Sequence, residues 1–249
     1  MAVDYLYASG VPVAPAVPKR SGDCLLSFVA PEGIRYGVLT RFVEGEILRH
    51  RSTVPAVRTY GGIVAQIHAL SDRMPFALQR SPIDLRAMLE QSVAAFEREA
   101  WDRREELAFL RASAAILQSQ VDQLPKENPA YGLIHGDVIR ANALVANDSR
   151  VTILDFDFCG DGWRAYDVAS YLHTIRGAPE ETEFEQAFLE GYNAVRPLTT
   201  AEQATLPLFE AVRAIYSIGV PAMNFEHWGS QYFYSFVDHE LAALKRWMR

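Results

Sequence analysis

The chain has 249 residues, of which 49% are hydrophobic and 22% are charged, so it is long enough and apolar enough to bury a sizeable core. Its formal net charge of −7 argues against a nucleic acid or an anionic membrane as partner, because both are usually bound by basic surfaces. Its two cysteines, Cys24 and Cys159, stand far apart and lack metal-ligand spacing, which argues against a disulfide framework or a zinc site.

The N-terminus shows neither an export signal nor a transmembrane span. No basic segment precedes an apolar run, and the uncharged stretch 5–18 is broken by three prolines. Reduced thiols also fit the cytosol. We therefore expect a cytoplasmic protein that does not bind membranes.

The first predicted element is a β-hairpin. Residues 23–30 and 35–43 are rich in strand formers and are separated by Pro31-Glu32-Gly33. The segment 42–46 then breaks the strand pattern and, on its residues alone, is typical of an ordinary loop.

A helix is predicted next. The apolar residues of 54–70 recur at helical spacing. His68 on this helix is more often a packed side chain than a ligand. We expect it in the interior.

A second helix is predicted to begin at Ser81, with this serine as its cap and Pro82 in its first turn. The following charged run, 97–106, mixes signs and places Glu99 and Arg103 one helical turn apart. This pattern favours a solvated helix face without a binding role.

The most informative segment, 133–172, contains His135, Asp137, Asn142 and Asp155. The apolar run before His135 is too short for a helix, so it predicts a buried strand that ends in a polar loop. Asp137 and Asn142 lie on that loop.

A second hairpin follows this loop. The runs 143–146 and 151–154 are joined by Asn147-Asp148-Ser149, a turn-forming triplet. A hairpin returns its ends to one place, so we expect Asp155 close to Asn142 although thirteen positions separate them.

These residue types suit phosphoryl transfer. The reaction requires a carboxylate to orient the attacking hydroxyl and hard oxygen ligands to hold Mg²⁺ against a triphosphate. Asp137 suits the first task, and Asn142 and Asp155 suit the second. His135 more plausibly stiffens the loop through hydrogen bonds than takes part in the reaction.

The remainder of the chain predicts four helices, at about 165–176, 181–194, 200–217 and 235–248, without internal repeats.

An aromatic cluster within 224–234 includes Glu226 and Trp228, and this composition could hold a cationic or amphipathic small molecule. Packing between helices is the alternative explanation for these aromatic residues. Asp157 lies close to the expected metal site and is either a supporting or substrate-contacting acid or a turn residue, whereas a turn is favoured for Asp161.

The run HGDVIRAN followed by LDFDF resembles the catalytic loop and metal-binding segment of the aminoglycoside phosphotransferase and choline kinase superfamily, whose members share the protein-kinase fold. Upstream, Gly10-Val11-Pro12-Val13 and YGVLTRFVEGE (36–46) resemble the last strands of the family's small lobe and its hinge. Downstream, GWRAYDVA (162–169) resembles the segment whose aspartate ties back to the catalytic loop.

This resemblance implies ATP and Mg²⁺ as cofactors and a small molecule as substrate. By position, it makes Asp137 the catalytic base and Asn142 and Asp155 the magnesium ligands. His135 and Asp167 would support the loop. The resemblance also makes Phe42 and Val43 the hinge residues that contact adenine.

The chain departs from the family where the nucleotide phosphates would be covered. It has no G-x-G-x-x-G, and none of its three lysines, Lys19, Lys126 and Lys245, lies in an apolar strand pattern. The expected fold is therefore α+β and protein-kinase-like, with the remnant of a small N-terminal lobe (1–43) and a hinge before a mainly helical lobe (44–249).

Three functions are compatible with these residues. The first is an ATP- and Mg²⁺-dependent kinase for an aminoglycoside, amino alcohol, amino acid or sugar, which the set Asp137, Asn142 and Asp155 favours. The second is a catalytically impaired binding or scaffold protein, or a fragment completed by another chain. The third, a metal-dependent phosphoesterase, is weaker because the six histidines are scattered. The sequence leaves the oligomeric state open.

Overall fold

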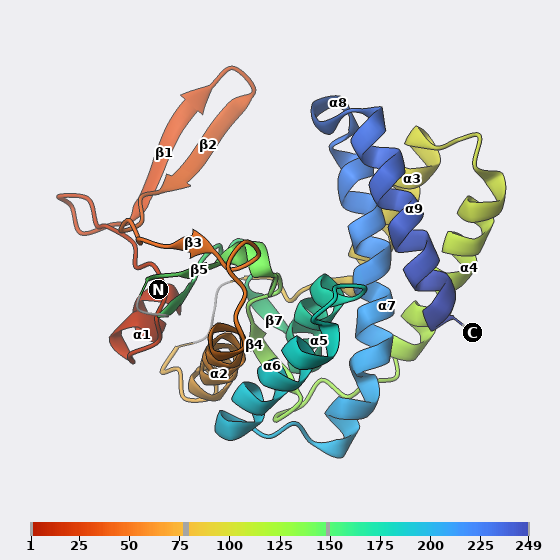
Figure 1. The fold of residues 1–249 in the computed structure, drawn as a ribbon. Helices are drawn as coiled ribbons and strands as arrows, with labels where there is room; N and C mark the ends of the chain where they lie inside the picture. The colour runs from red at the N-terminus through yellow and green to blue at the C-terminus, as the bar shows by residue number, and fades with distance from the viewer. Residues whose placement is uncertain (1, 77–79, 148–149, 249) are drawn as a thin grey trace. The chain divides into compact units, whose positions relative to one another are not determined.

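The structure, a computed structural model, describes residues 2–76, 80–147 and 150–248 (Figure 1). The chain forms two compact units, and each of them combines three separate stretches of the sequence. The first unit comprises Met1–Gln79, Asp137–Phe158 and Gly177–Pro197, and the second comprises Arg80–Gly136, Cys159–Arg176 and Leu198–Arg249. The predicted boundary near residue 43 stays a prediction.

The first unit contains α1 (Ala2–Ala8), β1 (Leu25–Ala30), β2 (Gly33–Val38), β3 (Glu46–Ile47), α2 (Val54–Ser71), the 3-10 turn η1 (Arg140–Asn142), β5 (Ala143–Val145), β6 (Val151–Ile153) and α6 (Glu181–Val195). Strands β3, β5 and β6 form an antiparallel sheet in that order. The second predicted hairpin, β5–β6, is therefore confirmed, although positions 148 and 149 of its turn lie outside the described residues.

The predicted N-terminal hairpin is also confirmed, since β1 and β2 pair antiparallel from Leu25↔Val38 to Ala30↔Gly33. The second strand was expected to reach residue 43 but ends at Val38. Figure 1 shows the hairpin extending away from α2 and the small sheet, and both of its faces expose large apolar side chains. Val29, for example, is 86% exposed.

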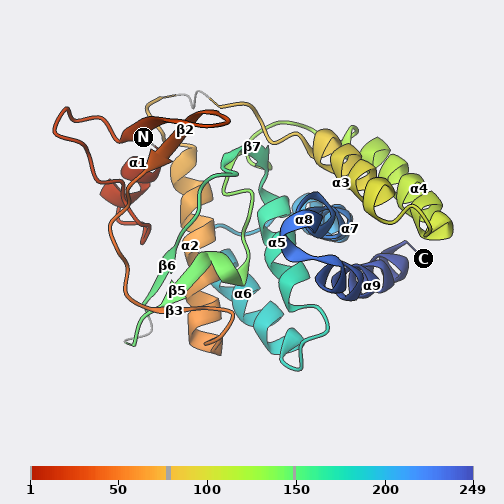
Figure 2. The same cartoon turned by 90° about the horizontal axis from the view of Figure 1, so that it is seen from above.

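The second unit contains α3 (Leu85–Glu99), α4 (Arg104–Val121), β4 (Tyr131–Ile134), β7 (Gly160–Trp163), α5 (Arg164–Ile175), α7 (Thr200–Met223), α8 (Phe225–Trp228) and α9 (Ser230–Trp247). Helices α3 and α4 lie side by side, as do α7 and α9 (Figure 2). Their facing apolar side chains form one core, of which Phe96, Phe209 and Phe233 are fully buried members. The α+β class is thus confirmed.

Three local predictions in this unit were wrong. Helix α3 is capped by Asp84 and not by Ser81, because the Asp84 side chain accepts a hydrogen bond from the Ala87 amide at 3.0 Å. Glu99 and Arg103 do not share a helix, since α3 ends at Glu99 and α4 begins at Arg104. Asp161 lies in β7 rather than in a turn, opposite Leu133 of β4.

Among the described residues, no helix combines the length and apolar composition that a membrane crossing requires.

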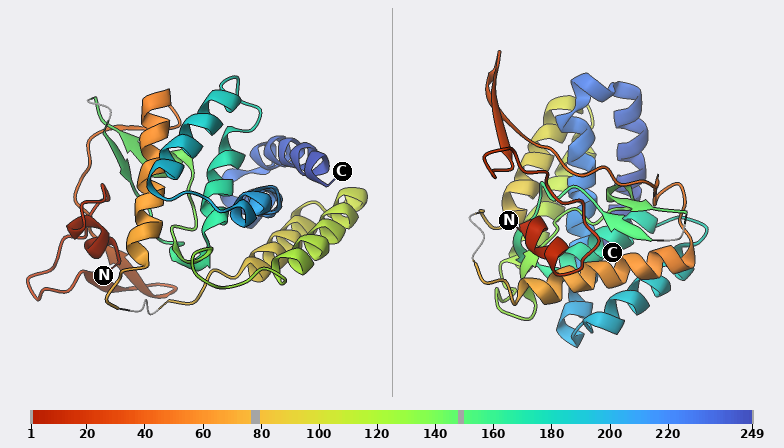
Figure 3. Two further views of the ribbon diagram at one scale, coloured as in Figure 1. Left: turned by 90° about the horizontal axis from the view of Figure 1, so that it is seen from below. Right: turned by 90° about the vertical axis from the view of Figure 1, so that its left-hand side faces the viewer.

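Two glycines allow the helices α2 and α6 to pack closely, side by side (Figure 3). A Cβ atom on Gly61 would lie 2.1 Å from the carbonyl oxygen of Phe188, and a Cβ atom on Gly191 would lie 1.9 Å from that of Arg58. Neither distance is possible without moving a helix backbone. The first unit therefore depends on small residues at this crossing.

We predict that Gly61→Ala destabilises the protein by about 1–3 kcal/mol, because the added methyl group overpacks the crossing. The neighbouring substitution Gly62→Ala is the matched control. Its Cβ would lie 3.5 Å from the Gly191 carbonyl oxygen, an ordinary contact, and alanine is the better helix former by about 0.5–1 kcal/mol. Urea denaturation of both variants measures the difference, and equal free energies of unfolding would contradict this account of the crossing.

Candidate active site

The short strand predicted before His135 is β4, and it pairs with β7 from Tyr131↔Trp163 to Ile134↔Gly160. Both strands belong to the second unit. The segment between the paired ends, 135–159, therefore begins and ends at the same place. It contains His135, Asp137, Asn142 and Asp155.

Asp167 of α5 binds the first residues of this segment. The backbone amide of His135 donates to Oδ2 of Asp167 at 2.7 Å, and that of Gly136 donates to Oδ1 at 2.8 Å. Asp167 and His135 are both fully buried. Gly136 has φ of 82°, a backbone conformation that favours glycine. These contacts fix the backbone directly before Asp137.

Asp137 and Asn142 are in direct contact within the first unit. The side-chain amide of Asn142 donates to Oδ2 of Asp137 at 2.7 Å and to its carbonyl oxygen at 3.0 Å. The turn η1 brings Asn142 back to Asp137. The backbone amide of Asn142 closes this turn by donating to the Ile139 carbonyl oxygen at 3.0 Å. With Nδ2 directed at Asp137, the amide oxygen of Asn142 is left to face another group.

The hairpin β5–β6 returns the chain to Asn142, as the sequence predicted. The amide of Leu154 donates to the Asn142 carbonyl oxygen at 2.9 Å, which places Asp155 one residue beyond that contact. Asp155 is exposed and has φ of 61°, the only positive φ at a non-glycine residue in the described part of the chain. Left-handed backbone at such a residue is commonly found at functional sites.

Sequence reasoning missed the support that α2 gives to the loop. Tyr60, fully buried in the apolar stripe of that helix, donates its hydroxyl to the Ile139 carbonyl oxygen at 3.0 Å. A tyrosine within an apolar stripe is the one available signal, because a buried phenol requires a hydrogen-bond partner. His68 is packed as predicted, with its Nδ1 atom 2.8 Å from the Tyr192 hydroxyl.

A cavity of about 610 Å³ opens beside Asp155, and we call it the Asp155 cavity. Its polar side chains include those of Asp155, Asp157 and Thr40, and most of its lining is apolar. The described lining contains no lysine or arginine.

The remaining candidate residues lie elsewhere. Phe42 and Val43 line a different cavity of the first unit, and the Phe42 side chain is almost fully exposed. Glu226 and Trp228 are on α8 in the second unit, where the Trp228 ring packs edge-on against Tyr232 at 5.4 Å. Of the predicted aromatic cluster, Phe233 is core and Trp228, Tyr232 and Tyr234 are exposed.

The donor set fits a hard divalent cation. Asp155 offers an exposed carboxylate and Asn142 an amide oxygen, and Mg²⁺ prefers such oxygen ligands. Next to this segment, burial raises the pKa of the Cys159 thiol to about 11. Its thiol is therefore protonated at neutral pH and is not a nucleophile.

Comparison with known proteins identifies the family. A sequence model described as the phosphotransferase enzyme family matches residues 2–204. A protein of Deinococcus radiodurans is 31% identical over 234 residues, which cover 92% of this chain and 67% of the relative. The homoserine kinase of Rhodopseudomonas palustris strain BisB18 is 30% identical over 206 residues, covering 76% of this chain and 59% of that enzyme. The chain therefore spans about 60% of the length of the curated relatives it matches.

Solved structures agree on the fold. The structure of a microcompartment-associated aminopropanol kinase superimposes with a TM-score of 0.81 at 26% identity, over 99% of this chain and 79% of the other. An amicoumacin kinase in complex with AMP-PNP, Ca²⁺ and Ami gives a TM-score of 0.76 at 18% identity, over 98% and 75% of the two chains, and this likeness shows the fold alone. The protein-kinase-like fold expected from the sequence is confirmed, and the chain belongs to the phosphotransferase enzyme family.

Proposed function

We propose that this chain carries the phosphotransfer site of an ATP- and Mg²⁺-dependent kinase, which transfers the γ-phosphoryl group to a hydroxyl of a small molecule. The observation that carries the proposal is the contact between Asp137 and Asn142, together with the hairpin that returns Asp155 to the same loop. A relative is a homoserine kinase and a structural neighbour is an aminopropanol kinase, so the acceptors we favour are amino acids and amino alcohols. Aminoglycosides and sugars are the other candidates.

In this proposal, Asp137 orients the acceptor hydroxyl and takes its proton as the hydroxyl oxygen attacks. Its Oδ2 atom accepts a hydrogen bond from Asn142, which orients the carboxylate. The hydrogen bonds of Asp167 and Tyr60 to the loop keep this carboxylate in position before the substrate arrives. Glu226, Trp228 and Asp157 are proposed to contact the acceptor, and Phe42 and Val43 the adenine.

Asn142 and Asp155 would hold the magnesium ion. The ion supplies positive charge against the nucleotide phosphates. That charge is needed, because the described lining of the Asp155 cavity has no basic side chain. Lys19 is occupied in a turn, where its ammonium lies 2.7 Å from Asp23.

The lack of a basic side chain in that lining also favours a second candidate function. Without a lysine for the phosphates, the chain could act as a kinase-like binding protein, or could require further polypeptide for activity. Nucleotide binding separates this candidate from the first, because a working site binds ATP with Mg²⁺.

We predict that the 249-residue chain binds ATP in the presence of Mg²⁺ and that Asp155→Asn weakens this binding at least tenfold. Asparagine tolerates the left-handed backbone at this position, so the substitution removes the charge and leaves the loop intact. Calorimetric titration with and without Mg²⁺ measures the effect, and Asp102→Asn, at an exposed position between α3 and α4 that does not line the cavity, is a matched control. Binding that Mg²⁺ and the substitution leave unchanged would contradict the assignment of Asp155.

For turnover, we predict that Asp137→Asn lowers kcat by about 10²–10⁴, the usual contribution of a general base, with little change in KM for ATP. The shape of the side chain is kept, so the loop is expected to remain folded. ADP release in the presence of homoserine, 1-amino-2-propanol, ethanolamine or an aminoglycoside measures activity. A variant that phosphorylates its acceptor at the unsubstituted rate would remove Asp137 from the reaction.

A further inference from the structure

A second cavity of the first unit, about 770 Å³ in volume, is lined by three arginines from separate parts of the chain. We call it the arginine cavity. Arg41 precedes β3, Arg51 follows it, and Arg150 precedes β6. Phe42 and Val43, the proposed adenine contacts, are part of its lining, but Asp137, Asn142 and Asp155 are not, so it adjoins the proposed nucleotide site without containing the groups proposed to react.

The two cavities lie on opposite faces of the same extended backbone. Pro12, Val13 and Pro15 line the arginine cavity, whereas Ala14 and Ala16 line the Asp155 cavity. The same alternation separates Arg41 from Thr40 and Thr152 from Ile153. Alternate side chains of an extended strand point to opposite faces, so a wall one backbone layer thick separates the two cavities.

Hydrogen bonds make the wall rigid. The Arg41 amide donates to the Pro15 carbonyl oxygen and the Ile153 amide donates to that of Pro12, both at 3.0 Å. The arginine cavity is therefore built on fixed backbone. It is not formed by loose surface side chains alone.

Several charged side chains of the arginine cavity are not paired with one another. In the part of the chain that the structure describes, the side chains of Arg41, Glu44 and Glu46 form no hydrogen bond or ion pair. Other arginines of the protein do pair with acids, as Arg58 does with Glu190 at 2.6 Å. The described lining holds three arginines and two glutamates, whereas the whole chain has an excess of acids and a formal charge of −7.

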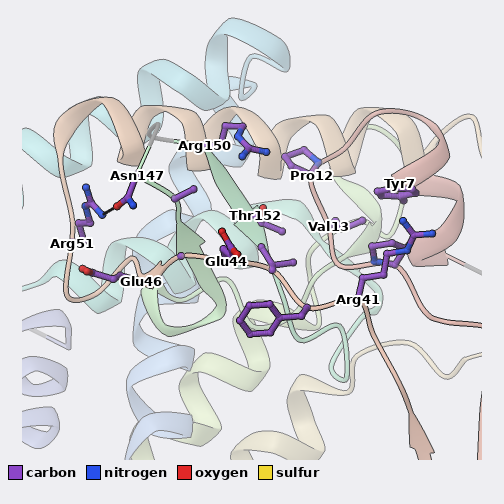
Figure 4. Close-up of a pocket in the computed structure, with 15 residues that line it drawn as sticks. Tyr7, Pro12, Val13, Arg41, Glu44, Glu46, Arg51, Asn147, Arg150 and Thr152 are labelled. Atoms are coloured by element: carbon purple, nitrogen blue, oxygen red, sulfur yellow. Dashed lines mark hydrogen bonds between the residues drawn. The ribbon is translucent and has the colours of Figure 1, made fainter.

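The arrangement of these charges indicates the shape of a ligand. Figure 4 shows Arg51 and Arg41 at opposite ends of the cavity, with Glu44, Thr152 and Arg150 between them. Arg51 is oriented by Asn147, whose Oδ1 atom accepts from its Nη1 atom at 2.8 Å. Guanidinium groups bind carboxylates and phosphates in bidentate geometry, and a central carboxylate accepts hydrogen bonds from hydroxyl groups.

We propose that the arginine cavity binds an elongated small molecule with an anionic group at each end and hydroxyl groups between them. The shared chemistry of the two ends is that of a carboxylate or a phosphate ester. A volume of this size is typical of sites for metabolites. This inference goes beyond the proposed kinase function, because Asp137, Asn142 and Asp155, the groups proposed to react, lie outside this cavity.

Calorimetric titration of the full chain, without nucleotide, tests the proposal with two six-carbon probes. Galactarate carries carboxylates at both ends and hydroxyls between them, and fructose 1,6-bisphosphate carries phosphates. We expect one of them to bind with a Kd below 1 mM. The corresponding single-ended molecule, gluconate or fructose 6-phosphate, is expected to bind at least tenfold more weakly, because it leaves one arginine without a partner.

Substitutions locate the binding. Arg41→Ala and Arg51→Ala are each expected to weaken the binding of the double-ended probe at least tenfold, and Arg20→Ala, an exposed arginine in a turn outside the cavity, is expected to leave it unchanged. Thermal unfolding confirms that the variants are folded. If Arg51→Ala unfolds because the contact with Asn147 is lost, Arg41→Ala decides alone.

Two outcomes would overturn the proposal. One is the absence of binding below 1 mM for both double-ended probes. The other is binding that Arg41→Ala leaves unchanged, or that Arg20→Ala weakens equally, since either result places the ligand outside the arginine cavity.

Discussion

The site depends on one constraint, namely that the segment carrying Asp137, Asn142 and Asp155 is held at both ends. The ladder between β4 and β7 joins the two ends, and the carboxylate of Asp167 binds the backbone at the start. Hydrogen bonds to a charged group are worth roughly 1.5–3 kcal/mol each. Within the segment, the hydrogen bond between Asn142 and Asp137 then orients the two side chains of the site.

The sequence predicted the elements whose pattern is local. The helix at 54–70, the strand before His135 and the hairpin after Asn142 each depend on a few neighbouring residues, and all three are present. The wrong predictions arose where the local conformation depends on a contact with a residue far away in the sequence. Residue 83 stays extended because its amide donates to the Asp161 carbonyl oxygen, so the cap of α3 moves from Ser81 to Asp84. No periodicity within the chain contains that information.

The same reasoning explains why the arginine cavity was not foreseen. Its arginines are separated by up to about a hundred positions, and each of them is an ordinary exposed or half-exposed residue in its own segment. Only the pairing of β3 with β5 and the bridge between Val13 and Ile153 bring these segments together. Tertiary pairing, and not composition, creates such a cavity.

The hairpin β1–β2 has a practical consequence. Among the described strands, β1 and β2 pair with each other alone, so each has an outer edge with backbone groups available for pairing, next to side chains such as Val29 and Phe28. An exposed apolar edge of this kind is a template for strand addition by other molecules. Solutions of the 249-residue chain are accordingly expected to self-associate as concentration rises, and charged substitutions on the outer edge are the means to keep the protein monodisperse.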